Sequence, residues 1–152
     1  MTEIYAVYGA SGCGRSLMPV ARQQLQRQNI NAEIYFIDDS LIEEIAINGH
    51  TALNYAAFKN LKADRKSVLI AIANSQIREK IAIQLEQDAI ELWTVQADNV
   101  VRMDDIEIAP GAALSPFVTL TSNIKIGKCF HANLYRYVEH DCILGDYVTF
   151  AP

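Results

Sequence analysis

Three ionisable side chains stand in succession at Glu139-His140-Asp141. Histidine is the side chain best suited to remove a proton near neutral pH, and a neighbouring carboxylate can orient its ring and stabilise its cation. A lone exposed histidine would usually be inert, but the flanking acids favour a functional role for His140. His131 and His50 have less company in the sequence, and we expect both to be structural or solvated.

A glycine-rich turn suggests a second kind of chemistry, the binding of phosphate. Its candidate ligand-binding residues are Gly9, Ser11, Gly12, Cys13 and Gly14. Free N–H groups at the start of a helix attract phosphate, and glycine lets a ligand approach the backbone closely. Because the spacing is G-x-x-G-x-G and not G-x-G-x-x-G, an NAD-dependent oxidoreductase is disfavoured. A tight strand-to-helix turn that binds nothing is the alternative.

Polar side chains follow two further apolar runs. Asp38 and Asp39 come directly after one run, and Asn74 and Arg78 come after another. Ligand contacts in open α/β sheets lie at the carboxyl ends of the strands, so these side chains are candidates for substrate binding. A carboxylate there can accept hydrogen bonds from a nucleoside. Solvated capping acids, and a surface helix position for Arg78, are the alternatives.

In the first two thirds of the chain, apolar spacings typical of helices and strands predict the elements that must position these groups. We expect strands at residues 4–8, 32–37, 67–73 and 90–95, and helices at about 15–28, 54–61 and 75–87. The third strand is apolar throughout, as in strands that are buried on both faces of a parallel sheet. Asn74 is a credible N-cap for the last helix. The alternation of strands and helices predicts a Rossmann-like α/β domain over residues 1–103.

A six-residue repeat replaces these periodicities in the remainder of the chain. Every sixth residue is apolar or small: Ile108, Leu114, Leu120, Ile126, Ala132, Val138, Leu144 and Phe150. Helices need spacings of three and four, and half-buried strands a spacing of two. The repeat predicts an all-β left-handed parallel β-helix over residues 104–152, a triangular prism with three hexads to a coil. Small residues directly after the repeat positions, such as Ser115, Gly127 and Asn133, predict corners there.

Composition excludes several classes of function. The formal net charge of −5 argues against nucleic acid as a partner. No apolar run is long enough to span a bilayer, and the N-terminus lacks the basic region of a secretion signal. Cys13, Cys129 and Cys142 are odd in number and lack the paired spacing of a zinc site. We therefore expect no metal site, and reduced thiols in a cytoplasmic protein.

Four segments carry a family resemblance: Tyr8 to Gly14, Phe36 to Asp39, Ile70 to Arg78 and, most specifically, Val138 to Asp146. Through them the whole chain resembles nucleotide-sugar acetyltransferases of the sialic-acid O-acetyltransferase type, which include bacterial N-acetyltransferases of UDP-4-amino-4,6-dideoxy sugars. The resemblance assigns His140 as general base and Asp141 as the acid that holds it. The glycine-rich turn and the paired aspartates would bind UDP. The family often has histidine at the position of Cys13, and some members have a second histidine near Thr149 or Phe150.

By this resemblance, the reaction moves an acetyl group from acetyl-CoA to the amino group of a UDP-linked 4-amino-dideoxy sugar in bacterial glycan biosynthesis. Acetylation of a sugar hydroxyl is an alternative. Family members continue for several coils that bind acetyl-CoA, so we expect a fragment whose coenzyme site lies mostly beyond residue 152. We also expect a homotrimer at full length. A nucleotide-sugar-binding module, inactive without those coils, is the non-catalytic alternative.

Overall fold

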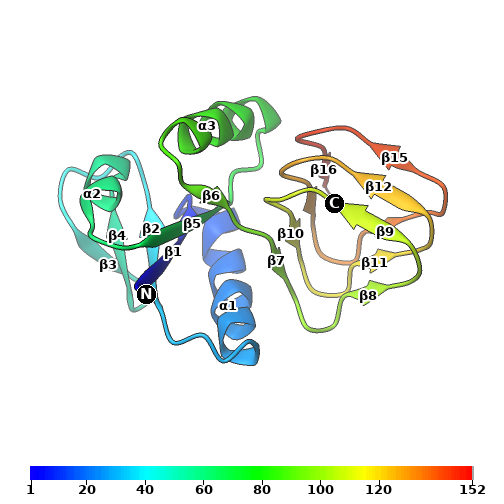
Figure 1. The fold of residues 1–152 in the computed structure, drawn as a ribbon, viewed down its shortest axis with the longest axis horizontal. Coiled ribbons are helices and arrows are strands. Elements are labelled where there is room, and N and C mark those ends of the chain that lie inside the picture. Colours follow the sequence, from blue (N-terminus) through cyan, green and yellow to red (C-terminus); the bar gives the residue numbers. More distant parts are fainter. Residues whose placement is uncertain (152) are drawn as a thin grey trace.

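The computed structural model describes residues 1–151, which form two domains that lie side by side (Figure 1). The strands of the first are β1 (Glu3–Tyr8), β2 (Glu33–Ile37), β3 (Ile45–Ile47), β4 (His50–Leu53), β5 (Arg65–Ile70) and β6 (Glu91–Leu92). Its helices are α1 (Gly12–Arg27), α2 (Tyr55–Asn60) and α3 (Ser75–Gln87). The sheet order is β3-β4-β2-β1-β5-β6, and all pairs except β3–β4 are parallel. This arrangement confirms the predicted α/β domain.

The central strand β1 is buried on both faces because its residues alternate between two apolar cores. Tyr5 and Val7 pack with the apolar side of α1. Ile4, Ala6 and Tyr8 pack with apolar residues of α2 and α3 on the other face. The helices therefore cover both sides of the sheet and leave its carboxyl edge to the loops that follow β1, β2 and β5.

The second domain consists of short parallel strands in three sheets. The strands are β7 (Val95–Gln96), β8 (Val101–Arg102), β9 (Ile106–Ile108), β10 (Ala113–Leu114), β11 (Thr119–Leu120), β12 (Ile124–Ile126), β13 (His131–Ala132), β14 (Tyr137–Val138), β15 (Ile143–Leu144) and β16 (Thr149–Phe150). The sheets are β7-β10-β13-β16, β8-β11-β14 and β9-β12-β15. Successive strands along the chain belong to successive sheets, so each coil visits three faces. This is the predicted β-helix.

The interior of the β-helix is filled by the repeat positions. Leu114, Leu120, Ile126, Ala132 and Val138 are all buried in one cluster, as the six-residue spacing predicts. Burial of a Leu-sized side chain contributes about 1.5–3 kcal/mol, so this column is a major source of the domain's stability. The polar residues between these positions remain on the outside of the prism.

The corner conformation falls at a different position from the one predicted. We expected left-handed residues directly after each repeat position, but the structure has them three residues after it. The series is Gly111, Phe117, Asn123, Cys129, Tyr135, Asp141 and Tyr147, with φ between 56° and 94°. A non-glycine residue there costs about 1–2 kcal/mol, and the ladders and buried column must offset that cost. Side-chain type alone therefore did not identify these corners.

Several strands differ from the sequence prediction. The strand expected at residues 90–95 divides into β6, which pairs with β5, and β7, which pairs with β10. The β-helix thus begins near residue 95, before the predicted boundary at residue 104. The sequence did not reveal these first strands, because too few hexads precede residue 106 to establish the repeat. The hairpin of β3 and β4 was not predicted, and His50 is the first residue of β4.

Helix α1 covers the first strand of the β-helix. The buried Gln24 amide donates from Nε2 to the Thr94 carbonyl at 2.9 Å and accepts from the Gln96 N–H at 2.7 Å. Arg27 Nη2 also donates to the Gln96 carbonyl, at 2.8 Å. The Thr94 carbonyl and the Gln96 N–H and carbonyl point away from β10, on the side where no earlier coil exists to pair with them. An open strand edge promotes aggregation, and α1 covers this one.

Within residues 1–151, no helix has the length and apolar composition needed to cross a bilayer.

Candidate active site

His140 and Asp141 lie at a corner of the prism, between β14 and β15. The His140 ring donates from Nδ1–H to Asp141 Oδ2 at 2.8 Å, and the two side chains are 71% and 73% exposed. Asp141 has a φ of 62°, so the left-handed corner turns its carboxylate next to the ring. With Nδ1–H donated to the carboxylate, Nε2 is the nitrogen that can accept a proton from a substrate.

The local charges favour the protonated form of this histidine. The hydrogen bond to Asp141 is the largest cause of the raised pKa of His140, followed by the charges of Asp141 and Glu139. A raised pKa makes the neutral ring a stronger base. The geometry and the charges together suit proton removal by His140.

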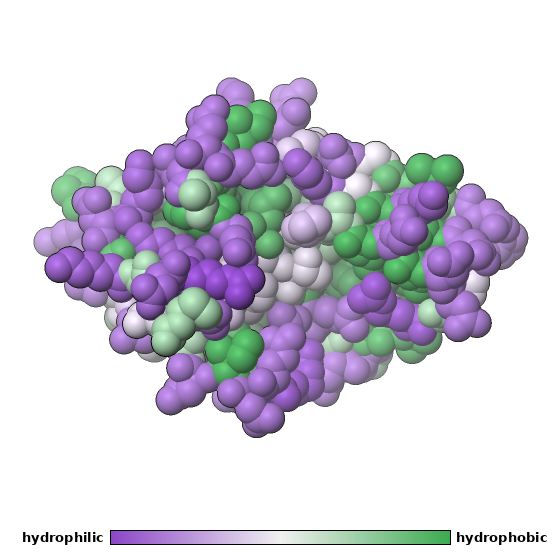
Figure 2. Space-filling model, in the orientation of Figure 1, coloured by the Kyte–Doolittle hydropathy of each residue, from purple (hydrophilic) through white to green (hydrophobic). Residues whose placement is uncertain are grey.

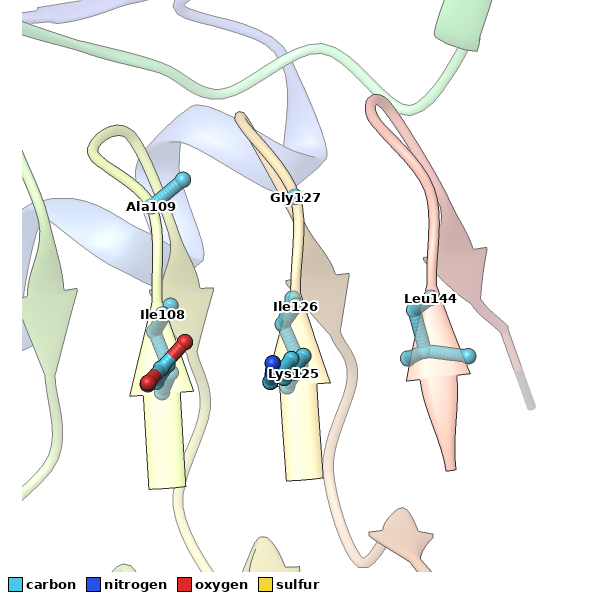
Figure 3. Close-up of a pocket in the computed structure, with 7 residues that line it drawn as sticks. Ile108, Ala109, Lys125, Ile126, Gly127 and Leu144 are labelled. Carbon is cyan, nitrogen blue, oxygen red and sulfur yellow. The ribbon is translucent and has the colours of Figure 1, made fainter. Parts of the chain in front are cut away.

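A concave surface adjoins this pair on the sheet of β9, β12 and β15. One hollow of about 380 Å³ is lined in part by Asp141, Asn123 and Lys125. A second, of about 450 Å³, is lined in part by Lys125 and Ile126 on the same sheet (Figure 3). Figure 3 shows that the repeat residues of three successive coils, Ile108, Ile126 and Leu144, lie side by side in the lining of this second hollow. The pair therefore borders a surface with room for a ligand.

The corner that carries His140 lies opposite the α/β domain. The sheet of β7, β10, β13 and β16 faces that domain: the buried His131 donates from Nε2 to the Ile70 carbonyl at 2.7 Å. This sheet is bounded by the corner that contains Cys129 and the corner that contains Tyr135. A triangular prism has only one further edge, and Figure 1 shows the chain passing from β11 to β12 at the far side of the β-helix. One chain therefore holds its histidine far from its own glycine-rich turn.

The glycine-rich turn is tighter than predicted because α1 already begins at Gly12. Gly9 has a φ of 117°, and a Cβ on Gly14 would lie 1.7 Å from the Gly9 carbonyl oxygen. Both positions therefore require glycine. Ser11 is the N-cap residue, but its side chain makes no capping hydrogen bond, and the first turn holds no acid. The first N–H groups of α1 are thus available to an anion.

A cavity of about 270 Å³ opens at this helix start, between the two domains. Gly12, Cys13 and Ala73 line it from the α/β domain, and Ser115 and Asn133 line it from the β-helix. Burial raises the pKa of the Cys13 thiol, which keeps it neutral. Sequence reasoning named Ser115 and Asn133 only as corner residues. The two residues stand one coil apart in the sequence, and this spacing is the signal that could have placed their side chains next to each other.

The two aspartates take different partners at the end of β2. Asp38 Oδ1 accepts from the N–H and the hydroxyl of Ser40, at 2.9 and 2.7 Å. Asp39 accepts from the hydroxyl of Tyr8, at 2.8 and 2.9 Å. Burial, followed by the Asp39 contact, raises the pKa of Tyr8, whose ring stacks on that of Tyr55. Tyr8 was read from the sequence only as an apolar strand residue, so its contact with Asp39 was missed.

The turn and the aspartates share one edge of the sheet. The Gly9 N–H donates to the Ile37 carbonyl at 2.7 Å, directly before Asp38. The Ala71 N–H donates to the Tyr8 carbonyl at 2.8 Å, which brings the end of β5 to the same edge. The structure therefore gathers the ends of β1, β2 and β5, as the parallel topology predicts.

Asn74 and Arg78 follow β5 but have structural contacts. Asn74 is the N-cap of α3, and its side chain accepts from the Ile77 N–H at 3.0 Å. Arg78 was predicted as a substrate contact, with a surface helix position as the alternative. It is fully buried, so the surface alternative is wrong. Its guanidinium donates to backbone carbonyls of both domains, which favours a structural role over contact with a substrate.

Comparison with known proteins fits these observations. The family model for the PglD N-terminal domain matches residues 5–85. The chain is 38% identical, over 151 residues, to GDP-perosamine N-acetyltransferase of Escherichia coli O157:H7, and covers 68% of that protein. The chain belongs to the PglD family of nucleotide-sugar N-acetyltransferases. The family predicted from the sequence is thereby confirmed.

Two solved structures extend the PglD-family relation to the fold. WeeI from Acinetobacter baumannii AYE has a TM-score of 0.93 and 51% identity, over 99% of this chain and 70% of that chain. The acetyltransferase domain of PglB from Neisseria gonorrhoeae FA1090, in complex with acetyl coenzyme A, has a TM-score of 0.82 over 98% of this chain and 70% of that chain. At 20% identity, the second comparison supports the fold alone. Both domains therefore follow the arrangement of solved family structures.

The buried His131 predicts a pH dependence of stability. Burial, and then the charge of Arg78, lower its pKa to about 4. The unfolded chain, with a histidine pKa of about 6.5, binds more protons between pH 6.5 and 4, so stability is lost as the pH falls through this window. We expect the loss to approach about 3 kcal/mol near pH 4.

Urea unfolding between pH 4 and pH 7 checks this expectation against a His131→Asn variant. The variant is expected to show a flatter pH dependence, because it lacks the group that gains the proton. Parallel curves for the two proteins would contradict the assignment.

Proposed function

We propose that this PglD-family chain transfers the acetyl group of acetyl-CoA to the amino group of a UDP-linked 4-amino-dideoxy sugar. The observation that carries the proposal is the exposed His140–Asp141 pair, whose raised pKa and free Nε2 suit a general base. The relative from E. coli O157:H7 is named as an N-acetyltransferase, which supports nitrogen over oxygen as the acceptor. The glycine-rich turn supports a phosphate-containing carrier.

Direct acyl transfer accounts for the residues present. The sugar amine attacks the thioester carbonyl and forms the C–N bond, while His140 Nε2 takes the proton of the amine. Asp141 stabilises the imidazolium that results. The C–S bond then breaks, and the coenzyme leaves as a thiol after receiving that proton. Backbone N–H groups can stabilise the oxyanion.

The separation of the two halves of the site supports a shared site between copies. The glycine-rich turn lies on the side of the β-helix that faces the α/β domain, and His140 lies on the opposite edge. A rigid chain cannot bring these groups together, but a neighbouring copy can present its His140 edge to the turn. A homotrimer closes such a head-to-tail arrangement without unpaired surfaces.

Exposed apolar side chains support packing between β-helices. They gather on the sheet of β8, β11 and β14 and on the corner beside it: Val101, Met103, Phe117, Leu134, Tyr135 and Tyr137. The rings of Phe117 and Tyr135 are stacked at 4.8 Å. Figure 2 shows a further hydrophobic area of the β-helix half, which in this view lies over β9, β10 and β12. Exposed apolar side chains that gather on one sheet and its corner are typical of an association face.

We expect His140→Ala to reduce the turnover of the full-length protein by roughly 10²–10⁴-fold, because the amine then loses its proton acceptor. Binding of UDP should stay near normal, since the turn that would hold it is on the other side of the chain. Steady-state kinetics and calorimetry measure the two effects. His50→Ala is the matched control, and unchanged turnover in His140→Ala would dismiss the base assignment.

Asp141→Asn should move the pH–rate profile. Asparagine tolerates the left-handed corner and keeps a hydrogen-bonding side chain, but it removes the charge that raises the pKa of His140. The limb of kcat/KM that rises as His140 loses its proton should shift to lower pH. The plateau should fall roughly tenfold or more, because the imidazolium is no longer stabilised.

Glu139→Gln is the control for this shift. Glu139 is the smallest of the causes that raise the pKa of His140, so its removal should move the limb less. A profile that is identical in the wild type and in Asp141→Asn would contradict the proposed pair.

Gly12 allows a direct test of the phosphate site. A Cβ at this position meets no atom within 4 Å, so Gly12→Asp should fold while placing a negative charge at the start of α1. We expect calorimetry to show UDP binding by the wild type and by Gly12→Ala, and a loss of at least about tenfold in Gly12→Asp, through repulsion of phosphate. Equal affinities would exclude phosphate binding at this helix.

The same titrations separate the alternatives. The E. coli relative named for GDP-perosamine makes GDP the competing carrier, and tighter binding of GDP than of UDP would reassign it. UDP binding by a full-length protein that transfers no acetyl group would support a non-catalytic binding module. NAD binding would support an oxidoreductase.

A further inference from the structure

Arg78 is the largest fully buried side chain among residues 1–151, and it carries a charge, which is unusual in a protein interior. Its Nε donates to the Cys129 carbonyl at 2.9 Å, and Nη1 donates to the Ile72 carbonyl at 2.8 Å and the Ala73 carbonyl at 3.2 Å. Its Nη2 is 3.0 Å from the Tyr147 carbonyl, 3.3 Å from that of Val148 and 2.7 Å from Thr149 Oγ1. Each guanidinium nitrogen therefore has an acceptor.

These acceptors are neutral oxygens. Among residues 1–151, no carboxylate lies within 4.0 Å of the Arg78 guanidinium. Burial lowers the pKa of Arg78, the thiols of Cys129 and Cys13 acting in the opposite direction. A buried charge is costly unless its donors are satisfied, so convergent carbonyls are required to keep it in place. Loss of one acceptor should therefore disturb the others.

The acceptors belong to three segments that are far apart in the sequence. Ile72 and Ala73 lie between β5 and α3, next to the edge that carries the glycine-rich turn. Cys129 precedes β13, and Thr149 lies in β16, so the two remaining segments are successive coils of the β-helix. His131 adds its own bond to the Ile70 carbonyl. One side chain thus joins the carboxyl edge of the sheet to two coils.

We propose that Arg78 is a positioning residue, which holds the nucleotide-binding edge of the α/β domain in a fixed orientation against the β-helix. The inference rests on the function proposed above. Arg78 touches neither substrate nor reacting atoms in this account. It acts through the placement of the glycine-rich turn, and so of the bound sugar, relative to the base of the neighbouring copy.

This role separates binding from turnover. The groups that would hold the nucleotide belong to the α/β domain, so nucleotide affinity does not require the Arg78 contacts. Acetyl transfer requires the amine to meet the base and the thioester, and a misplacement of about 1 Å can cost 10²-fold in rate. A weakened Arg78 network should therefore lower kcat and leave nucleotide affinity unchanged.

The experiment compares Arg78→Gln, Arg78→Lys and the control Arg65→Gln in the full-length protein. Arg65 is an exposed arginine that pairs with Glu91 and Glu3. We expect kcat to fall roughly 10–100-fold in Arg78→Gln and less in Arg78→Lys, which keeps a charge and some donors. The Kd for UDP should stay within about twofold in both, and Arg65→Gln should match the wild type.

Two results would overturn the proposal. Arg78→Gln with wild-type kcat would show that the orientation does not depend on this side chain. A large loss of UDP affinity, with kcat retained at saturation, would make Arg78 the substrate contact that the sequence predicts.

Thr149→Val is a milder variant for the case in which Arg78→Gln fails to fold. It removes the acceptor at 2.7 Å, together with the hydrogen bond that the Thr149 hydroxyl donates to the Ala73 carbonyl at 3.4 Å, and it keeps the shape of the side chain. We expect kcat to fall about two- to fivefold with unchanged UDP affinity, and no further loss when Thr149→Val is added to Arg78→Lys. A wild-type kcat, or independent effects in the double variant, would overturn the proposal.

Thermal unfolding distinguishes this inference from the proposed function. Absence of acetyl transfer in the wild type would refute the function alone. The Arg78 contacts would still predict one unfolding transition in the wild type and two in the Arg78 variants, as the domains uncouple. A single transition in every variant that folds would refute the coupling.

Discussion

The sheet of β7, β10, β13 and β16 packs against the α/β domain, and this contact determines where everything else can lie. Gln24 hydrogen-bonds to the backbone beside the first strand of that sheet. Arg78 and His131 form hydrogen bonds between the two domains at the later coils, those of β13 and β16. Because a prism has one edge opposite each face, the contact leaves His140 on the far side. The base and the glycine-rich turn of one chain are therefore held apart, and the proposed chemistry requires two copies.

Repeating patterns made much of this fold predictable from the sequence. The hexad series from Leu114 to Val138 predicts the β-helix, since a spacing of six suits no other common element. The apolar run after Arg65 and the N-cap at Asn74 likewise predict β5 and α3. His140 and Asp141 could be proposed as a pair because neighbours in sequence at a corner remain neighbours in space. In these cases the pattern of residues within one segment was enough to predict the structure.

The remaining features depend on contacts between distant segments. Arg78 lies on a helix whose local pattern says nothing of the β-helix carbonyls that surround it, so its burial was not foreseen. The same holds for Tyr8, whose hydroxyl reaches Asp39 just beyond the end of the neighbouring strand β2. The left-handed corners fall on Phe117 and Tyr135 because coil closure overrides residue preference. Long-range geometry, and not local propensity, decided these positions.

Mixing two impaired variants tests the shared site most directly. His140→Ala lacks the base, and Gly12→Asp has a weakened phosphate site, so each should transfer little acetyl group alone when the sugar substrate is kept well below its Kd for Gly12→Asp. In mixed trimers formed at equal amounts, an intact pair of halves meets at about a quarter of the interfaces. We expect acetyl transfer to return to about that fraction of the wild-type rate. No recovery in verified mixed trimers would show that each chain builds its site alone, and would contradict the account.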